Sequence, residues 1–95
     1  MLMEVRELRY FLAVAREENI TRAAESLHIA QPSLSKQLME LEKKLGKKLL
    51  IRGKRKITLT EEGVLLRKRA EEILELVEKT QPEISSDTED VIGDI

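Results

Sequence analysis

The sequence predicts a mainly α-helical fold of three short helices and a β-hairpin, followed by a fourth, long helix. Apolar residues recur at helical spacing in separate segments, and glycine or proline marks several of the segment ends. A glycine-containing turn also joins two short apolar runs, residues 49–51 and 57–59, which is typical of a hairpin. The 95 residues are enough for one domain with a single modest core.

The first two helices are expected at residues 4–17 and 22–27. In the first segment, apolar residues recur at i, i+3, i+4 and i+7 and therefore share one helix face: Leu8, Phe11, Leu12 and Ala15. Asn19 and Thr21 precede the second segment, and both residue types favour the N-cap position. The small side chains of Ala23 and Ala24 would let another helix cross closely, as packing inside a helix-turn-helix requires.

The third helix is expected to begin at Gln31-Pro32 and to end at Gly46. Proline suits the first helical turn, so Gln31 should lie near the cap and Pro32 near the first helical position. Leucines spaced by four, three and four residues should face the core: Leu34, Leu38, Leu41 and Leu45. The opposite face then presents mainly small, polar and charged residues: Pro32, Ser33, Ser35, Lys36, Met39, Glu40 and Lys43.

A hairpin with a charged tip and a long helix complete the predicted elements. The tip, residues 52–56, contains four cations and one glycine. Thr60 is a suitable N-cap for a helix that should run to about Thr80, where Gln81-Pro82 should close it. The chain would then consist of a domain of residues 1–59, a helix of residues 60–80 and an acidic linker of residues 81–95.

The long helix carries more apolar surface than a small domain is expected to cover. Its stripe follows helical spacing: Leu66, Ala70, Ile73 and Val77, widened by Leu65, Leu74 and Leu76. We expect the preceding domain to cover only the first turn or two. The remainder predicts a partner helix, most simply that of a second copy, and hence a homodimer.

Charge is segregated along the chain behind a net value of -1. Residues 1–60 contain 13 Lys/Arg and 7 Asp/Glu, a net of +6, whereas residues 61–95 contain 4 and 11, a net of -7. The densest cationic run, residues 47–56, includes no acid and suits phosphate groups. The chain has no cysteine, which excludes disulfides, thiolate zinc sites and a cysteine nucleophile. The N-terminal residues resemble neither a signal peptide nor a membrane span, so a cytoplasmic location is expected.

Together these elements predict a winged helix-turn-helix that inserts its third helix into a DNA major groove and contacts the DNA backbone with the hairpin. A helical dimeric protein-interaction or adaptor module is the alternative, for which an exposed apolar groove on the third helix would be expected. An enzyme is not expected, because no carboxylate pair, metal-ligand set or glycine-rich phosphate loop is visible. The one histidine, His28, is expected at the surface or in a turn.

Residues 4–80 resemble the DNA-binding domain and linker helix of LysR-type transcriptional regulators. The matching residues are Leu8, Tyr10, Phe11, Ala13 and Val14; Thr21, Arg22, Ala23, Ala24 and Leu27; Gln31, Pro32, Ser33, Leu34, Ser35, Lys36 and Gln37; Leu41, Glu42, Leu45 and Gly46; Leu49, Arg52 and Arg55; and Leu59, Thr60 and Gly63. The chain departs from the usual family pattern at Ala30, where Ser or Thr is common, and at Leu50 and Glu62.

The resemblance implies a role for each group of residues. Those nearest the base edges would be Gln31, Pro32, Ser33, Ser35 and Lys36. Thr21 and Arg22 would contact a phosphate through a hydroxyl, free backbone N–H groups and a cation. The wing residues on the backbone and adjacent minor groove would be Arg52, Lys54, Arg55 and Lys56.

The resemblance also implies how the chain would act within a longer protein. It would be the N-terminal part of a bacterial transcription regulator that binds an interrupted dyad in double-stranded DNA as a homodimer, or as a tetramer at full length. Residues 91–95 resemble the opening of the first strand of an effector-binding domain. Residues 1–95 would hold no cofactor, and a small-molecule effector would bind that further domain.

Overall fold

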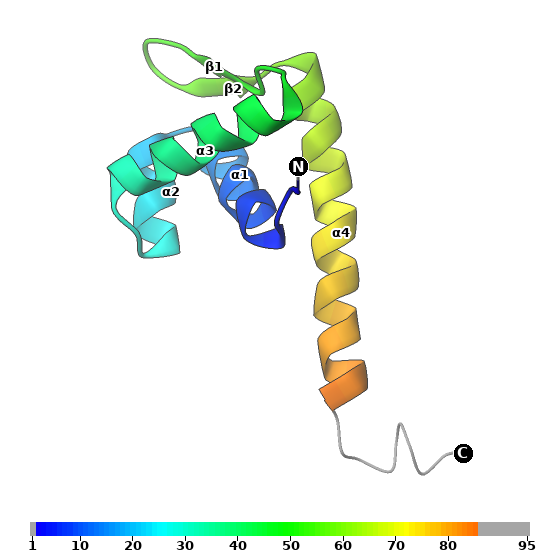
Figure 1. Ribbon diagram of the computed structural model, residues 1–95. Helices are drawn as coiled ribbons and strands as arrows, with labels where there is room; N and C mark the ends of the chain where they lie inside the picture. Colours follow the sequence, from blue (N-terminus) through cyan, green and yellow to red (C-terminus); the bar gives the residue numbers. More distant parts are fainter. Residues whose placement is uncertain (1, 86–95) are drawn as a thin grey trace, which may run out of the picture.

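The computed structural model describes residues 2–85 and confirms a mainly α-helical fold with one hairpin. In chain order the elements are α1 (Val5–Glu17), α2 (Ile20–Leu27), α3 (Gln31–Leu45), β1 (Leu50–Arg52), β2 (Ile57–Leu59) and α4 (Glu61–Ser85). The first three helices and the hairpin form a small body, and α4 extends away from it (Figure 1). Within residues 2–85, no helix is long and apolar enough to cross a membrane.

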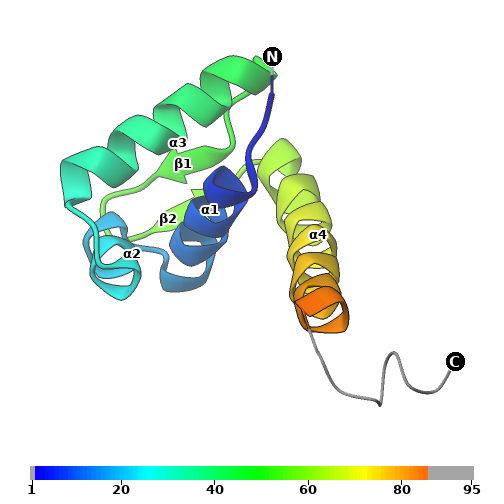
Figure 2. The ribbon, with the colours of Figure 1, turned by 60° about the horizontal axis from the view of Figure 1, so that its bottom comes forward.

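The core lies where α1, α2 and α3 meet, under the hairpin (Figure 2). Its largest fully buried side chains are Phe11, Val14, Leu34, Leu38 and Leu41. The expected leucine stripe of α3 is therefore confirmed, with Leu45 partly buried at its end. Leu49, Leu50 and Ile57 join the same cluster from the hairpin, so the hairpin is packed on the helices at its root.

Local side-chain chemistry explains the ends of α2 and α3, with small shifts from the prediction. Asn19 is the cap of α2, because its Oδ1 accepts the N–H of Arg22 at 2.8 Å; Thr21 therefore lies inside the first turn. Helix α3 begins one residue early, with Ala30 as a cap that has no side-chain hydrogen bond. Pro32 tolerates this shift because an N–H in the first turn has no intrahelical partner to lose. Gly46 ends α3 at φ 69°, as expected.

The hairpin is antiparallel, and its first strand begins at Leu50, one residue later than expected. The register pairs Leu50 with Leu59 and Arg52 with Ile57. Leu49 stays outside the ladder because its N–H donates to the Glu42 carboxylate, and its carbonyl accepts the N–H of Thr60. A backbone bond of 3.0 Å from Gly53 N–H to the Lys56 carbonyl closes the turn.

The long helix begins as expected but ends later. Thr60 caps it, since its Oγ1 accepts the N–H of Gly63 at 3.0 Å. The expected end at Thr80 is wrong, because the helix continues through Pro82 to Ser85. A proline this close to a helix end removes a single N–H bond, and the surrounding turn is exposed to water, which makes the loss tolerable. Residues 81–85 thus belong to α4, and the rest of the expected linker lies outside the described residues.

Helix α4 packs on its own domain much further than the first turn or two. Gly63, Ala70 and Leu74 are buried, and Leu66 packs against the core cluster. An ion pair of 3.9 Å between Arg9 and Glu78 lies further along the α1–α4 contact. The expected dimer stripe therefore needs correction: Ala70 is 0% exposed and Leu66 packs within the domain, because α1 runs along that side of α4.

A buried ion pair ties the start of α1 to the end of α3. The Glu7 side chain is 3% exposed, and its Oε2 accepts a hydrogen bond of 2.8 Å from Lys44 Nζ. Burial opposes ionisation of Glu7, but hydrogen bonds from the Glu4 N–H and Lys44, together with the nearby positive charges, hold its pKa below the ordinary value. This pair helps to fix the angle at which α3 crosses α1.

Candidate nucleic-acid interface

The first two turns of α3 present the expected base-reading residues together on one surface. Gln31, Pro32, Ser33 and Lys36 are exposed and Ser35 is half-buried, while Leu34 behind them is fully buried. Gln31 Nε2 donates a hydrogen bond of 3.4 Å to Ser35 Oγ, so these two side chains lie side by side on the face. The face offers hydroxyl, amide and ammonium groups, which can hydrogen-bond with base edges.

Met39 lies on the same face, although it was not among the residues predicted to contact DNA. It is 61% exposed. It lines a shallow open hollow along α3 that is formed by Gln31, Pro32, Ser35, Lys36, Met39, Glu40 and Lys43. Helical periodicity already placed Met39 outward, but a thioether has no hydrogen-bonding pattern that would signal a polar site. Its apolar surface could contact a thymine methyl group.

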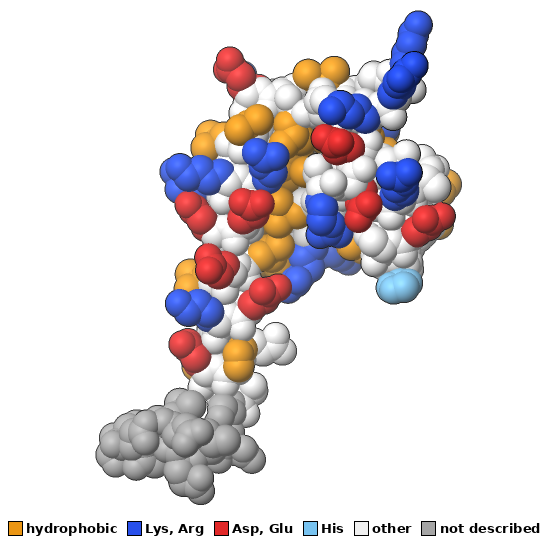
Figure 3. Space-filling model, turned by 180° about the vertical axis from the view of Figure 1, so that it is seen from behind, with side chains coloured by type: hydrophobic (Ala, Val, Ile, Leu, Met, Phe, Trp, Pro, Cys, Tyr) orange, Lys and Arg blue, Asp and Glu red, His pale blue; other side chains and the backbone are white. Residues whose placement is uncertain are grey.

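The wing carries the cationic residues expected there. Arg52, Lys54, Arg55 and Lys56 are all exposed around the hairpin turn. A view from behind shows Lys and Arg side chains projecting at the hairpin end of the molecule, opposite the far end of α4 (Figure 3). Such a projection of positive charge can reach phosphates on either side of a groove.

The cationic run of residues 47–56 contains no acidic residue, but folding brings two acidic residues from other segments beside it. Glu18 lies 3.9 Å from Lys56 Nζ, and Glu42 lies 3.9 Å from Lys48 Nζ. Both lysine side chains are more than half exposed, so these pairs are weak and leave the ammonium groups accessible. Within residues 2–85, the other four cations of the run form no ion pair: Lys47, Arg52, Lys54 and Arg55.

The start of α2 lies beside the wing, as the expected phosphate contact would require. A shallow hollow there is lined by Glu18, Asn19, Ile20 and residues 52–57. Thr21 and Arg22 are exposed, but the N–H of Arg22 is occupied by Asn19 Oδ1. Of the free backbone N–H groups expected at the start of α2, that of Arg22 is taken by the cap, whereas the Thr21 hydroxyl and the Arg22 guanidinium remain exposed. His28 is exposed at the end of α2 with φ 60°, so it is a turn residue as expected.

Comparison with known proteins identifies the family. Residues 5–64 match the family model for bacterial regulatory helix-turn-helix proteins of the LysR family. The regulator BsdA of Bacillus subtilis (strain 168) is 49% identical over 92 residues, which cover 96% of this chain and 32% of BsdA. The chain thus spans between 20% and 32% of the length of such curated relatives.

Solved structures agree with this match. A complex of the BenM DNA-binding domain with catB site 1 DNA has a TM-score of 0.83 and 43% identity, and covers 90% of this chain and 100% of that one. Vibrio fischeri DarR in complex with DNA has a TM-score of 0.85 and 33% identity, and covers 90% of this chain and 29% of DarR. The fold is therefore a winged helix-turn-helix followed by a long helix, and the chain belongs to the LysR family of bacterial regulatory helix-turn-helix proteins.

Proposed function

We propose that this chain binds double-stranded DNA with sequence preference, as the DNA-binding part of a transcription regulator. The observation that carries the proposal is the outer face of α3, where polar and cationic groups are exposed directly above a buried leucine stripe. A rigid helix that presents such groups fits the major groove. The cationic wing next to it supplies phosphate contacts, and the similar BenM and DarR structures contain DNA.

The α3 face also argues against a protein-interaction module. Five of the seven residues that line the hollow along it are polar or charged, and although carbon atoms make up most of its surface, charged or polar groups interrupt that surface between Pro32 and Met39. A groove that accepts an amphipathic helix would need a continuous apolar floor. The proposal assigns binding and no catalysis, in keeping with the regulator functions named for the curated relatives.

Two copies would act together through α4. The apolar surface of α4 that its own domain leaves uncovered includes Ile73, Leu76 and Val77, of which Leu76 is 64% exposed. The hairpin and α3 lie at one end of the molecule and the far end of α4 at the other (Figure 1). Pairing through α4 would place two α3 helices on a DNA dyad with half-sites separated by about one helical turn or a multiple of it.

In a longer protein of the kind its relatives represent, this chain would be the DNA-binding part of a regulator. Such a regulator would work in the cytoplasm, on the nucleoid. A small-molecule effector would bind a separate C-terminal domain, and residues 1–95 would need no cofactor to contact DNA.

If α3 reads base edges, substitutions on its outer face should weaken DNA binding by an amount that depends on the DNA sequence. Replacing Gln31 or Ser35 with alanine should cost about 1 to 3 kcal/mol at one or two base positions and little on random duplexes. The fold should survive, because Gln31 is exposed and Ser35 is half-buried. The measurement is a gel-shift titration on a site selected from a random duplex pool, with single base-pair variants. Equal losses on selected and random DNA would contradict base reading by α3.

Phosphate binding by the wing predicts a change in salt dependence. Replacing Arg52 and Arg55 together with alanine should weaken binding to selected and random duplexes alike, because phosphates are common to both. The slope of log affinity against log salt should fall in magnitude by about one for each phosphate that the variant no longer neutralises. Titrations at several salt concentrations measure it, with Arg67 and Lys68 on exposed α4 as matched positions for a control pair of alanines. A slope that stays at the wild-type value would remove the wing from the DNA.

A further inference from the structure

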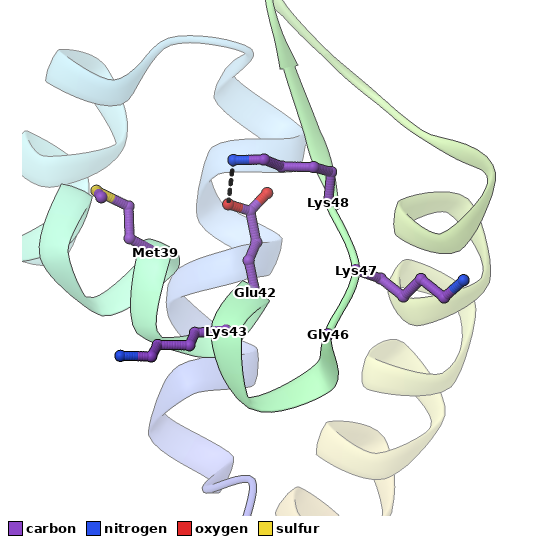
Figure 4. A pocket seen from close by; sticks show the side chains of 6 residues that line it. All are labelled: Met39, Glu42, Lys43, Gly46, Lys47 and Lys48. Atoms are coloured by element: carbon purple, nitrogen blue, oxygen red, sulfur yellow. Dashed lines mark ion pairs between the residues drawn. The ribbon is translucent and has the colours of Figure 1, made fainter.

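Glu42 holds the root of the wing from the last turn of α3. Its side chain is 12% exposed, and its Oε2 accepts backbone hydrogen bonds from Leu49 N–H at 2.8 Å and Leu50 N–H at 3.2 Å. Its other oxygen lies 3.9 Å from Lys48 Nζ (Figure 4). One carboxylate thus joins the last turn of the helix to the first residues of the hairpin.

The same peptide segment is held by the start of α4. Thr60 N–H donates to the Leu49 carbonyl at 3.1 Å, and Thr60 Oγ1 donates to the Lys48 carbonyl at 2.7 Å. A Cβ on Gly63 would clash with the Leu49 carbonyl oxygen, so only glycine lets the helix approach this strand so closely. The polar groups of Leu49 are therefore fully engaged, its N–H by α3 and its carbonyl by the cap of α4.

Besides these hydrogen bonds, the wing is fixed at its root by the packing of Leu50 and Ile57 in the core cluster. On the other strand, Ile57 N–H donates to the Glu18 carbonyl at 2.9 Å. A two-stranded hairpin is at best marginally stable alone, so its orientation depends on such contacts at its root. At about 3.3 Å per residue, three strand residues place the tip roughly 10 Å from the root, where a rotation of about 10° moves it by about 2 Å. That displacement is enough to break a hydrogen bond to a phosphate.

The charge of Glu42 would otherwise oppose DNA binding. Glu42 lines one hollow with Lys43, Lys47 and Lys48, of which Lys48 points toward it while Lys43 and Lys47 point away (Figure 4). A carboxylate there repels the phosphates of DNA, so its presence needs a compensating gain. Hydrogen bonds from N–H groups to an ionised acceptor supply one, because they are stronger than those to a neutral acceptor. Two such bonds on one oxygen are a specific use for the charge.

We propose that Glu42 is a positioning residue that sets the direction of the wing relative to α3, and through it the reach of Arg52 and Arg55 toward DNA. The inference rests on the proposed function. It differs from a purely electrostatic role, which predicts tighter DNA binding when the negative charge is removed. It differs also from a purely structural role, which predicts equal damage to base reading by α3 and phosphate binding by the wing.

The test combines Glu42→Ala and Glu42→Gln with the Arg52→Ala/Arg55→Ala double variant in a mutant cycle. Glu42→Ala should weaken binding on the order of tenfold and lower the salt slope toward that of the double variant. In the double-variant background it should have little further effect. Hydroxyl-radical protection of the backbone beside the α3 half-site should disappear, while methylation interference within the half-site persists. Glu42→Gln keeps an oxygen acceptor and should show smaller losses of affinity, salt slope and backbone protection. It tests the same inference if the Glu42→Ala protein fails to fold.

Lys48→Ala is the matched control. It removes the 3.9 Å ion pair of Glu42 but leaves both backbone hydrogen bonds, so the wing protection should stay in place even where the lost ammonium charge lowers the overall affinity for DNA. Equal or tighter binding by both Glu42 variants, or a loss of the same size in the double-variant background, would overturn the inference while wild-type binding stands. Wild-type protein without affinity for any duplex would instead overturn the proposed function and this inference with it.

Discussion

Replacing Leu38 with alanine is expected to destabilise the fold by about 2 to 5 kcal/mol, a large share of the stability of a small domain. Leu38 is 2% exposed and belongs to the core cluster shared by α1, α2, α3 and the hairpin. The substitution removes buried apolar surface and leaves a cavity that rigid helices fill poorly. Urea unfolding followed by circular dichroism measures the difference.

Met39→Ala provides the matched control for Leu38→Ala. The two residues are adjacent in sequence, and Met39 is 61% exposed, so its truncation should change stability by only about 0.5 kcal/mol. Any loss of DNA binding in Leu38→Ala would then follow from unfolding, whereas a loss in Met39→Ala would come from the surface of α3. A Leu38→Ala protein as stable as the wild type would contradict the packing described for the core.

The fold was predictable where neighbouring residues decide the structure. The leucine spacing of α3, Gly46 and the Thr60 cap are local signals, and all three predictions are confirmed. Boundaries shifted where two local preferences compete. Pro32 allowed α3 to start at Gln31, and Pro82 did not stop α4, because proline near a helix end removes little hydrogen bonding.

The site was predictable as a set of exposed residues but not as a set of contacts. Periodicity placed Gln31, Ser35 and Lys36 on the outer face of α3, and their exposure agrees. The bonds from Glu42 to the wing root and the approach of Glu18 to Lys56 join residues from different elements. Such pairs depend on where the hairpin lies against α1 and α3, which a single sequence does not display. The covered side of α4 was missed for the same reason, because spacing shows an apolar stripe without showing what covers it.

Replacing Ile73 with glutamate is expected to convert a dimer to monomers. Ile73 is 37% exposed and lines an apolar surface of α4 with Leu76 and Val77, whereas the neighbouring Leu74 is buried against the chain's own body. Two facing helices would each receive a carboxylate in an apolar contact, which costs desolvation and adds repulsion. The domain itself should stay folded, because its own core does not include Ile73.

Loss of pairing should also weaken DNA binding, without any change in α3 or the wing. A monomer keeps both elements for one half-site but no longer binds the second half-site intramolecularly, so affinity for a two-half-site duplex should fall by about 10² to 10⁴. Analytical ultracentrifugation measures the oligomeric state, and a footprint of wild type and variant measures the half-sites. Val64→Glu is the matched control, because Val64 is 47% exposed and lies nine residues, or two and a half turns, from Ile73 on the opposite side of α4. It should remain dimeric. A wild-type chain that is monomeric at high micromolar concentration and protects a single half-site would exclude α4 as the pairing surface, and the two-fold arrangement on DNA would then have no basis in this part of the protein.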